Sequence, residues 1–198
     1  MSNVEVNISF AVQNTRVKVT QPVEDKEKEY ETHFDANYVD GFRAPRAYIS
    51  TTGPMRNTHN IFWKMVYEQD VRIIVMISHL QEGGKVMCDQ YWPEKGNVIY
   101  GDISVTSVRD DVLAFYTLRT FNIEQIALKT TKKQKTEQKA VHTVYQYQYT
   151  AWPDYGVPLH ALPLISFIRN SAAANADSRP PIVIHCRYED ENFDSIKS

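Results

Sequence analysis

Residues 72–78 form the most apolar stretch of the chain, with Ile73, Ile74, Val75, Met76 and Ile77 in one unbroken run. The run is too short for a helix. Because it shows no alternation of apolar and polar positions, it predicts a strand buried on both faces, as in the middle of an α/β sheet. We therefore expect a central sheet with helices over it.

A second short apolar run, 182–184, follows the Pro180-Pro181 turn. Its length and its proline boundary predict another strand. This strand leads directly to His185 and Cys186.

Two segments have helical periodicity. The first, 58–68, has Thr58 in the N-cap position, and its core face is predicted to hold Phe62, Met65 and Val66. The second, 159–174, has Pro163 in its first turn. Its buried stripe is predicted to hold Leu164, Phe167, Ile168 and Ala172.

Between the two helices the pattern changes to extended segments, 85–88, 98–108, 112–121 and 140–149, with turns at 93–96 and 109–111. This order predicts an antiparallel meander. The last segment alternates. We expect a buried face with Val141, Thr143, Tyr145, Tyr147 and Tyr149, and a wet face with His142, Gln146 and Gln148.

The remaining segments are polar. Residues 14–20 alternate as an extended segment, and 24–31 form a charged run that predicts a solvated loop. The lysine-rich segment 129–139 predicts a solvated hairpin tip, and 187–198 predict a frayed tail. The chain, 1–198, is expected to form a single domain.

Composition excludes several classes of protein. With 22 Lys+Arg against 24 Asp+Glu, the net charge of −2 gives no basic field to hold nucleic acid or an anionic membrane. No apolar run approaches the roughly 18 residues that span a bilayer. Cys88 and Cys186 lie far apart and no apolar leader is present, which predicts a cytoplasmic protein. The six His and two Cys lack ligand spacing, so neither metal nor cofactor is expected.

Five motifs occur in register along most of the chain. They are Asp-Ala-Asn-Tyr-Val-Asp-Gly-Phe (35–42), Phe-Trp-Lys-Met-Val (62–66), Cys-Asp-Gln-Tyr-Trp-Pro (88–93), the Trp-Pro-Asp segment (149–158) and Val-Ile-His-Cys (183–186). In order and spacing the chain resembles the cysteine-dependent protein tyrosine phosphatases. Segments 42–48 and 62–68 are most similar to the tyrosine phosphatase-like proteins of bracoviruses.

The resemblance implies a twisted mixed sheet flanked by helices, in the α/β (α+β) class. It also implies a two-step mechanism, in which Cys186 attacks phosphotyrosine and Asp154 protonates the leaving phenol. In the family the cysteine begins a Cys-x5-Arg loop, whose backbone N–H groups bind the phosphate dianion and lower the pKa of the thiol.

This sequence departs from that loop. Cys186 is followed by Arg-Tyr-Glu-Asp-Glu-Asn, so Asn192 occupies the arginine position and three acids lie where the dianion binds. The family's tyrosine-stacking loop falls at 4–6, which hold no aromatic residue, and the chain ends before the family's last helices. These departures predict an inactive, C-terminally truncated member in which Cys186 and Asp154 are vestigial and no phosphate-binding residue remains.

Three functional hypotheses follow. The first is a non-enzymatic protein that binds partners, among them phosphotyrosine signalling proteins of a host cell. The second is a residual phosphatase that uses Cys186 and Asp154. The third is a product that barely folds, because loss of the covering helices would expose strands 72–78 and 182–184.

Four further residues have simpler expected roles. We expect Cys88 to be a packed strand thiol and His185 to be a hydrogen-bonded structural histidine. Tyr38 and Asp40 are expected to be scaffold positions. None of the four is needed for the chemistry that the resemblance implies.

Overall fold

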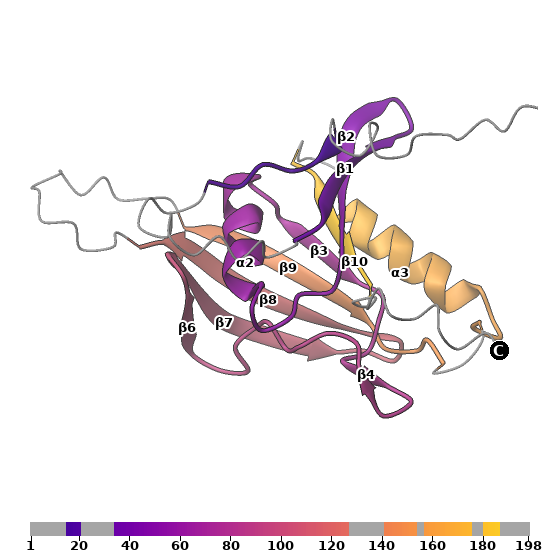
Figure 1. Ribbon diagram of the computed structural model, residues 1–198. Helices are drawn as coiled ribbons and strands as arrows, with labels where there is room; N and C mark the ends of the chain where they lie inside the picture. The colour runs from indigo at the N-terminus through magenta and orange to yellow at the C-terminus, as the bar shows by residue number, and fades with distance from the viewer. Residues whose placement is uncertain (1–14, 21–33, 127–140, 154–156, 176–179, 187–198) are drawn as a thin grey trace, which may run out of the picture.

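The structure is a computed structural model that describes residues 15–20, 34–126, 141–153, 157–175 and 180–186. One eight-stranded sheet has the order β1-β2-β10-β3-β9-β8-β7-β6, and β4 and β5 form a separate hairpin (Figure 1). The strands are β1 Ala36–Gly41, β2 Ala44–Thr51, β3 Ile73–Met76, β4 Gln81–Glu82, β5 Lys85–Val86, β6 Asn97–Tyr100, β7 Ile103–Val112, β8 Tyr116–Gln125, β9 His142–Tyr149 and β10 Ile182–His185. The described helices are α2 His59–Glu68 and α3 Leu162–Ala173. The predicted α+β class is confirmed.

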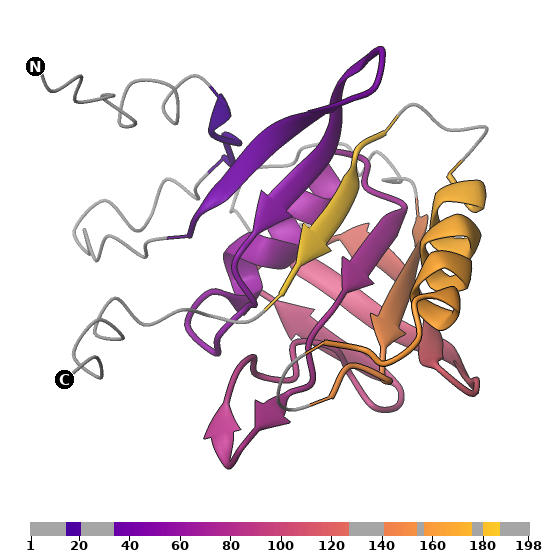
Figure 2. The same cartoon turned by 90° about the vertical axis from the view of Figure 1, so that its right-hand side faces the viewer.

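The centre of the sheet is parallel and its flanks are antiparallel. β10 pairs in parallel with β2 on one side and β3 on the other, and β3 pairs in parallel with β9. Figure 2 shows β10 lying between β2 and β3. All four residues of β3 are buried, as the apolar run at 72–78 predicts.

The two helices cover opposite faces of the sheet (Figures 1 and 2). α2 buries Phe62, Trp63, Met65 and Val66 in the larger core, which confirms the predicted core face. Thr58 precedes the helix as predicted, but its side chain does not cap it. The hydroxyl of Thr58 is instead engaged with Met55: its oxygen accepts from the N–H of Met55 and its O–H donates to the carbonyl of Met55, each at 3.0 Å.

α3 covers the other face through a narrower stripe than predicted. Phe167 and Ser171 are buried and Leu164 packs partly against the second core. Ile168 is 54% exposed and Ala172 is also exposed, so the prediction for these two residues is wrong. The helix touches the sheet along positions four apart, which turns the next residue along toward solvent.

The exposure expected of strands 72–78 and 182–184 is not found. Ile73 is fully buried and Ile182 is 8% exposed, because both lie in the core that α3 covers. α3 itself does expose apolar side chains, at Leu162, Ile165 and Ile168.

The meander is confirmed for β6 to β9, with different turns, but not for segment 85–88, because β5 pairs with β4 in a separate hairpin. The predicted strand 98–108 is interrupted by the turn at Gly101 and Asp102, which separates β6 from β7. The predicted turn at 109–111 lies inside β7, after a register irregularity between Ser107 and Arg109. These polar residues resemble a turn in sequence, but they pair across to β8, where Asp110 meets Arg119 at 3.4 Å.

The predicted wet face of β9 is in fact buried. Gln146 is fully buried and Gln148 is 6% exposed, whereas Tyr145 is 38% exposed. β9 lies between β3 and β8 in the sheet, and its last four residues, Gln146 to Tyr149, are buried on both faces. The glutamines are tolerated there because each amide has hydrogen-bond partners.

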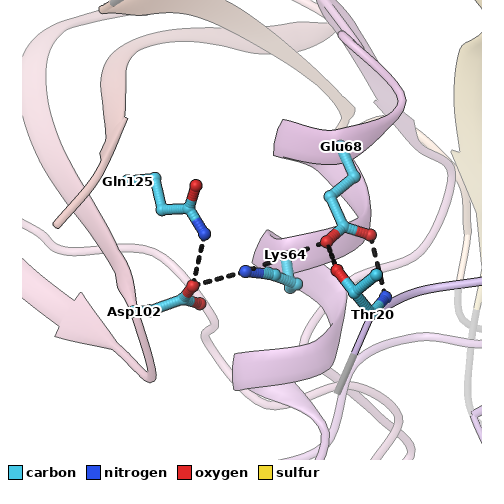
Figure 3. A network of polar contacts seen from close by, with 5 residues as sticks. All are labelled: Thr20, Lys64, Glu68, Asp102 and Gln125. Carbon is cyan, nitrogen blue, oxygen red and sulfur yellow. Dashed lines mark hydrogen bonds and ion pairs between the residues drawn. The ribbon is translucent and has the colours of Figure 1, made fainter. Parts of the chain in front are cut away.

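A polar network fastens α2 to its surroundings (Figure 3). Lys64 binds Asp102 in the turn between β6 and β7, and Asp102 also accepts from Gln125 of β8. Glu68, at the end of the same helix, accepts from the backbone N–H of Thr20 at 3.0 Å. One helix face therefore joins the N-terminal extended segment to the meander.

The segment 14–20 is described from residue 15 and is extended from Arg16, which bridges Asn37. Val17 donates its N–H to the carbonyl of Ala36 at 2.8 Å. The predicted loop 24–31, hairpin tip 129–139 and tail 187–198 lie outside the described residues.

Candidate functional site

The candidate site lies at the carboxyl end of β10. Cys186 follows the last residue of this strand and is exposed. Because β2, β10 and β3 are parallel, their carboxyl ends meet at the same edge of the sheet. The strand is held there by the N–H of Ile77, which donates to the carbonyl of His185 at 3.1 Å.

Gly53 lets a neighbouring loop approach Cys186. A Cβ on Gly53 would lie 2.7 Å from the carbonyl oxygen of Cys186 and 3.1 Å from the Cβ of Cys88. Real side chains do not tolerate the first of these distances. The two cysteines, far apart in sequence, are therefore both brought close to the same glycine.

Cys88 is buried, as predicted, but it lies in the loop after β5 rather than in a strand. Its thiol contacts the carbonyl of Pro54 at 3.4 Å. Burial, with smaller contributions from Asp89 and Cys186, raises the pKa of the Cys88 thiol to about 12. Cys88 therefore stays protonated and is a poor nucleophile.

His185 is the hydrogen-bonded structural histidine that the sequence predicts. Its Nε2 lies 2.8 Å from the hydroxyl of Tyr91, and its Nδ1 lies 3.1 Å from the carbonyl oxygen of Cys186. Burial lowers the pKa of His185 to about 4, against the hydrogen bond to Cys186, which acts to raise it. The imidazole is therefore neutral near pH 7.

Sequence reasoning missed the polar residues behind His185. Gln146 donates to the Tyr91 hydroxyl at 2.6 Å and accepts from Arg119 at 3.0 Å. Arg119 also stacks on the ring of Trp92, with its guanidinium carbon 4.5 Å from the centroid. The sequence held no signal for this group, because Arg119 faces Gln146 only through the register of β8 against β9, and alternation alone assigned the glutamines to solvent.

Within the Trp-Pro-Asp segment, residues 154–156 lie outside the described residues. The carbonyl of Trp152 lies 3.2 Å from Nε2 of His79, and the Trp152 ring packs edge-on against Tyr149. Asp154, Asn192 and the acids after Cys186 lie outside the described residues. Their predicted places beside Cys186 stay predictions.

Tyr38 and Asp40 lie in β1 of the β1–β2 hairpin, whereas Cys186 follows β10. Asp40 accepts from the N–H of Arg46 at 2.8 Å, and the Arg46 guanidinium stacks on the Tyr38 ring. Both contacts brace the hairpin, which is what a scaffold role requires. An open depression of about 550 Å³ beside them, lined also by Thr15 and Pro45, is remote from the chemistry of Cys186.

Within the described ranges, no cluster of three or more His, Cys, Asp or Glu side chains could hold a metal ion. None of the helices in these ranges has the length and apolar character needed to cross a membrane.

Comparison with known sequences identifies the family. The sequence profile of the protein-tyrosine phosphatase family matches residues 4–188. The chain belongs to the protein-tyrosine phosphatase family.

Three relatives give the scale of the similarity. A mosquito protein named as a receptor-type tyrosine-protein phosphatase, mosPTP-1 of Culex quinquefasciatus, is 46% identical over 178 residues, which cover 89% of this chain and 12% of that protein. Receptor-type tyrosine-protein phosphatase zeta of Rattus norvegicus is 44% identical over 184 residues, 91% of this chain and 8% of that protein. Tyrosine-protein phosphatase 99A of Drosophila melanogaster is 45% identical over 154 residues, 78% of this chain and 12% of that protein.

The chain thus spans only 8% to 13% of the length of the first three curated relatives that it matches. The closer likeness to bracovirus proteins is not tested by these comparisons and stays a prediction.

Proposed function

We propose that this member of the protein-tyrosine phosphatase family does not hydrolyse phosphotyrosine and acts by binding partner proteins. The proposal rests on one observation, the six residues that follow Cys186. They place Asn192 where the family motif has its phosphate-binding arginine, and they include no glycine.

Electrostatics oppose phosphate binding at this position. Glu189, Asp190 and Glu191 follow Cys186 closely in sequence. A carboxylate about 4 Å from another charge interacts by about 4 kcal/mol at an effective dielectric of 20, and toward a phosphate dianion this energy is repulsive. A neutral Asn192 does not offset it.

The lost donors add a second penalty. Each donor that stabilises a transition-state oxyanion typically contributes about 2.7–4 kcal/mol, so losing several lowers the rate by many orders of magnitude. Cysteine attacks as the thiolate, and without the donors of the loop the stabilisation of the thiolate is lost as well.

A residual phosphatase is the second candidate. Two observations favour it: Cys186 is exposed at the carboxyl end of a central parallel strand, and the relatives are named as phosphatases. In this alternative Cys186 forms the cysteinyl-phosphate and Asp154 protonates the leaving phenol. Another cation would then replace the missing arginine.

Phosphate release from a phosphotyrosine peptide and from an aryl phosphate separates the two candidates. The wild-type chain is measured beside Cys186→Ser, which removes the nucleophile, and Asp154→Ala, which removes the acid. We expect equal background rates for all three proteins. Turnover that disappears in Cys186→Ser would establish the residual phosphatase instead.

The partners we propose are phosphotyrosine signalling proteins, in the cytoplasm of a host cell if the bracovirus likeness holds. Fluorescence anisotropy compares one labelled peptide with phosphotyrosine and with unmodified tyrosine. Tighter binding of the phosphorylated peptide supports these partners. Equal binding of the two peptides would exclude recognition of the phosphate.

A further inference from the structure

The residues behind Cys186 form a chain of hydrogen bonds with a defined direction. Its members are Arg119 of β8, Gln146 of β9, Tyr91, His185 of β10 and the main-chain carbonyl of Cys186. We propose that Arg119 is a positioning residue that sets the direction of this chain, and through it the proton position on His185 and the carbonyl of Cys186.

Arg119 fixes the first member. Its Nη1 contacts the side-chain oxygens of Gln146 at 3.0 Å and Gln148 at 2.9 Å. A guanidinium only donates hydrogen bonds and stays charged in proteins, so each glutamine must present its oxygen to it. The NH₂ group of Gln146 then points the other way, toward Tyr91.

Tyr91 passes the direction on. Its oxygen accepts from Gln146 at 2.6 Å, so its own O–H is left to donate to Nε2 of His185 at 2.8 Å. Nε2 therefore carries no proton, and the neutral imidazole holds its proton on Nδ1. That proton is donated to the carbonyl oxygen of Cys186, 3.1 Å away.

Because the members are buried, the direction of the hydrogen bonds affects stability. Gln146 and Tyr91 are fully buried and His185 is 1% exposed. A buried polar atom that loses its partner costs about 1–3 kcal/mol, so the members hold their orientations together. If the hydrogen bonds ran in the reverse direction, an unprotonated Nδ1 would face the lone pairs of the Cys186 carbonyl, and the end of β10 would have to shift.

Hydrogen bonds in the reverse direction would require an acceptor at the position of Arg119. An amide, a hydroxyl and an imidazole can each donate or accept, so the three middle members are compatible with either direction. Arg119 cannot accept and the carbonyl of Cys186 cannot donate, so both ends favour the same direction, and Arg119 is the end that a side-chain substitution can change. This assignment goes beyond the proposed function, because it holds whether or not Cys186 takes part in hydrolysis.

The test is the protonation of His185 Nε2, read from nitrogen-15 spectra of the full chain with labelled histidine at neutral pH. The His185 signals are identified as those that disappear in the His185→Gln variant. In the wild type we expect Nε2 bare and Nδ1 protonated. A protonated Nε2 in the wild type would overturn the proposal.

Gln146→Glu should reverse the chain. A carboxylate between Arg119 and Tyr91 accepts from both, so the Tyr91 oxygen becomes free to accept from Nε2–H of His185. We expect Nε2 to become protonated, whether as the other neutral tautomer or as the imidazolium.

Gln148→Glu is the matched control. It places the same new charge against the same guanidinium, but the amide nitrogen of Gln148 contacts the carbonyl of Ser78, not Tyr91. We expect Nε2 to stay bare in this variant. If the protonation of Nε2 changes equally in the two glutamate variants, the added charge alone explains the effect, and the proposal is overturned.

A second pair of variants covers the case in which Gln146→Glu does not fold. Arg119→Met removes the obligate donor, so the Gln146 amide can turn and Nε2 should become partly protonated. Arg119→Lys keeps a donor and should restore the wild-type spectrum. Wild-type protonation in a folded Arg119→Met would overturn the role of Arg119.

Discussion

The carbonyl oxygen of Cys186 occupies the place where a side chain on Gly53 would begin, at 2.7 Å from an ideal Cβ. Gly53 follows β2 by two residues, and Cys186 follows β10 by one. The end of the strand that carries the candidate nucleophile is therefore fitted against the backbone of its neighbour.

Gly53→Ala should destabilise the protein and disturb Cys186. The added methyl meets backbone on one side and the Cys88 side chain on the other, and such overpacking costs about 1–3 kcal/mol. Denaturant unfolding measures the loss, and the rate at which maleimide alkylates Cys186 should also change. Gly84→Ala, in open space between β4 and β5, should leave the alkylation rate unchanged; a change there would contradict a local effect.

Maleimide should label the two cysteines at very different rates. Cys186 is exposed, whereas Cys88 is buried and its thiol has a pKa of about 12. Mass spectrometry should find one adduct on the native chain and two in concentrated guanidinium chloride. The native Cys186→Ser variant should carry none, and rapid labelling of Cys88 in that variant would show that the loop around it opens.

Phe167→Ala should loosen α3. Phe167 is the large buried residue of this helix, and its ring packs against Tyr116, Tyr147 and Tyr149. We expect a loss of about 3–5 kcal/mol in the free energy of unfolding. Ile168→Ala, one position along and 54% exposed, should change it by less than about 0.5 kcal/mol. Similar losses would mean that both residues face the sheet.

Stability should fall as the pH falls from about 6.5 to about 4. Burial lowers the pKa of His185 from 6.5 to about 4. As the pH falls across this window, the unfolded state binds a proton before the folded state does, which stabilises the unfolded state relative to the folded one. The stabilisation is complete above about pH 6.5, and up to about 3 kcal/mol is lost by pH 4. Burial also lowers the pKa of His59 and His142, which adds to the slope in the same direction.

Urea midpoints measured across this pH range test the expectation. His185→Gln should remove most of the slope, because it deletes the most buried of these imidazoles. An unchanged slope in that variant would assign the effect to the remaining histidines.

The sequence predicted those elements whose faces differ in hydrophobicity. β3 and the core face of α2 were found because burial on two sides or one side leaves a distinct pattern. The face of α3 was only partly found, since Ile165 and Ile168 are as apolar as the buried Phe167. The burial of Gln146 was not predicted, because a polar side chain in a core is accepted only for its specific partners.

Of the site, only the residues that directly follow an apolar strand in the sequence could be predicted. Cys186 was located because it ends an apolar strand, and His185 because it precedes the cysteine. The contributions of Arg119 and Gly53 depend on contacts between residues far apart in sequence. Register and close approach of this kind cannot be inferred from periodicity, which reports only the neighbours along one strand.

The position of β10 has a consequence for synthesis of the chain on the ribosome. β10 is the last described strand to be made, yet it lies between β2 and β3 in the sheet. Until residues 182–185 leave the exit tunnel, β2 and β3 cannot reach their final pairing, and each presents an open edge of backbone donors and acceptors. Before β10 is available, the centre of the sheet is therefore missing one strand. The period before β10 leaves the tunnel is the one in which chaperones would be most needed.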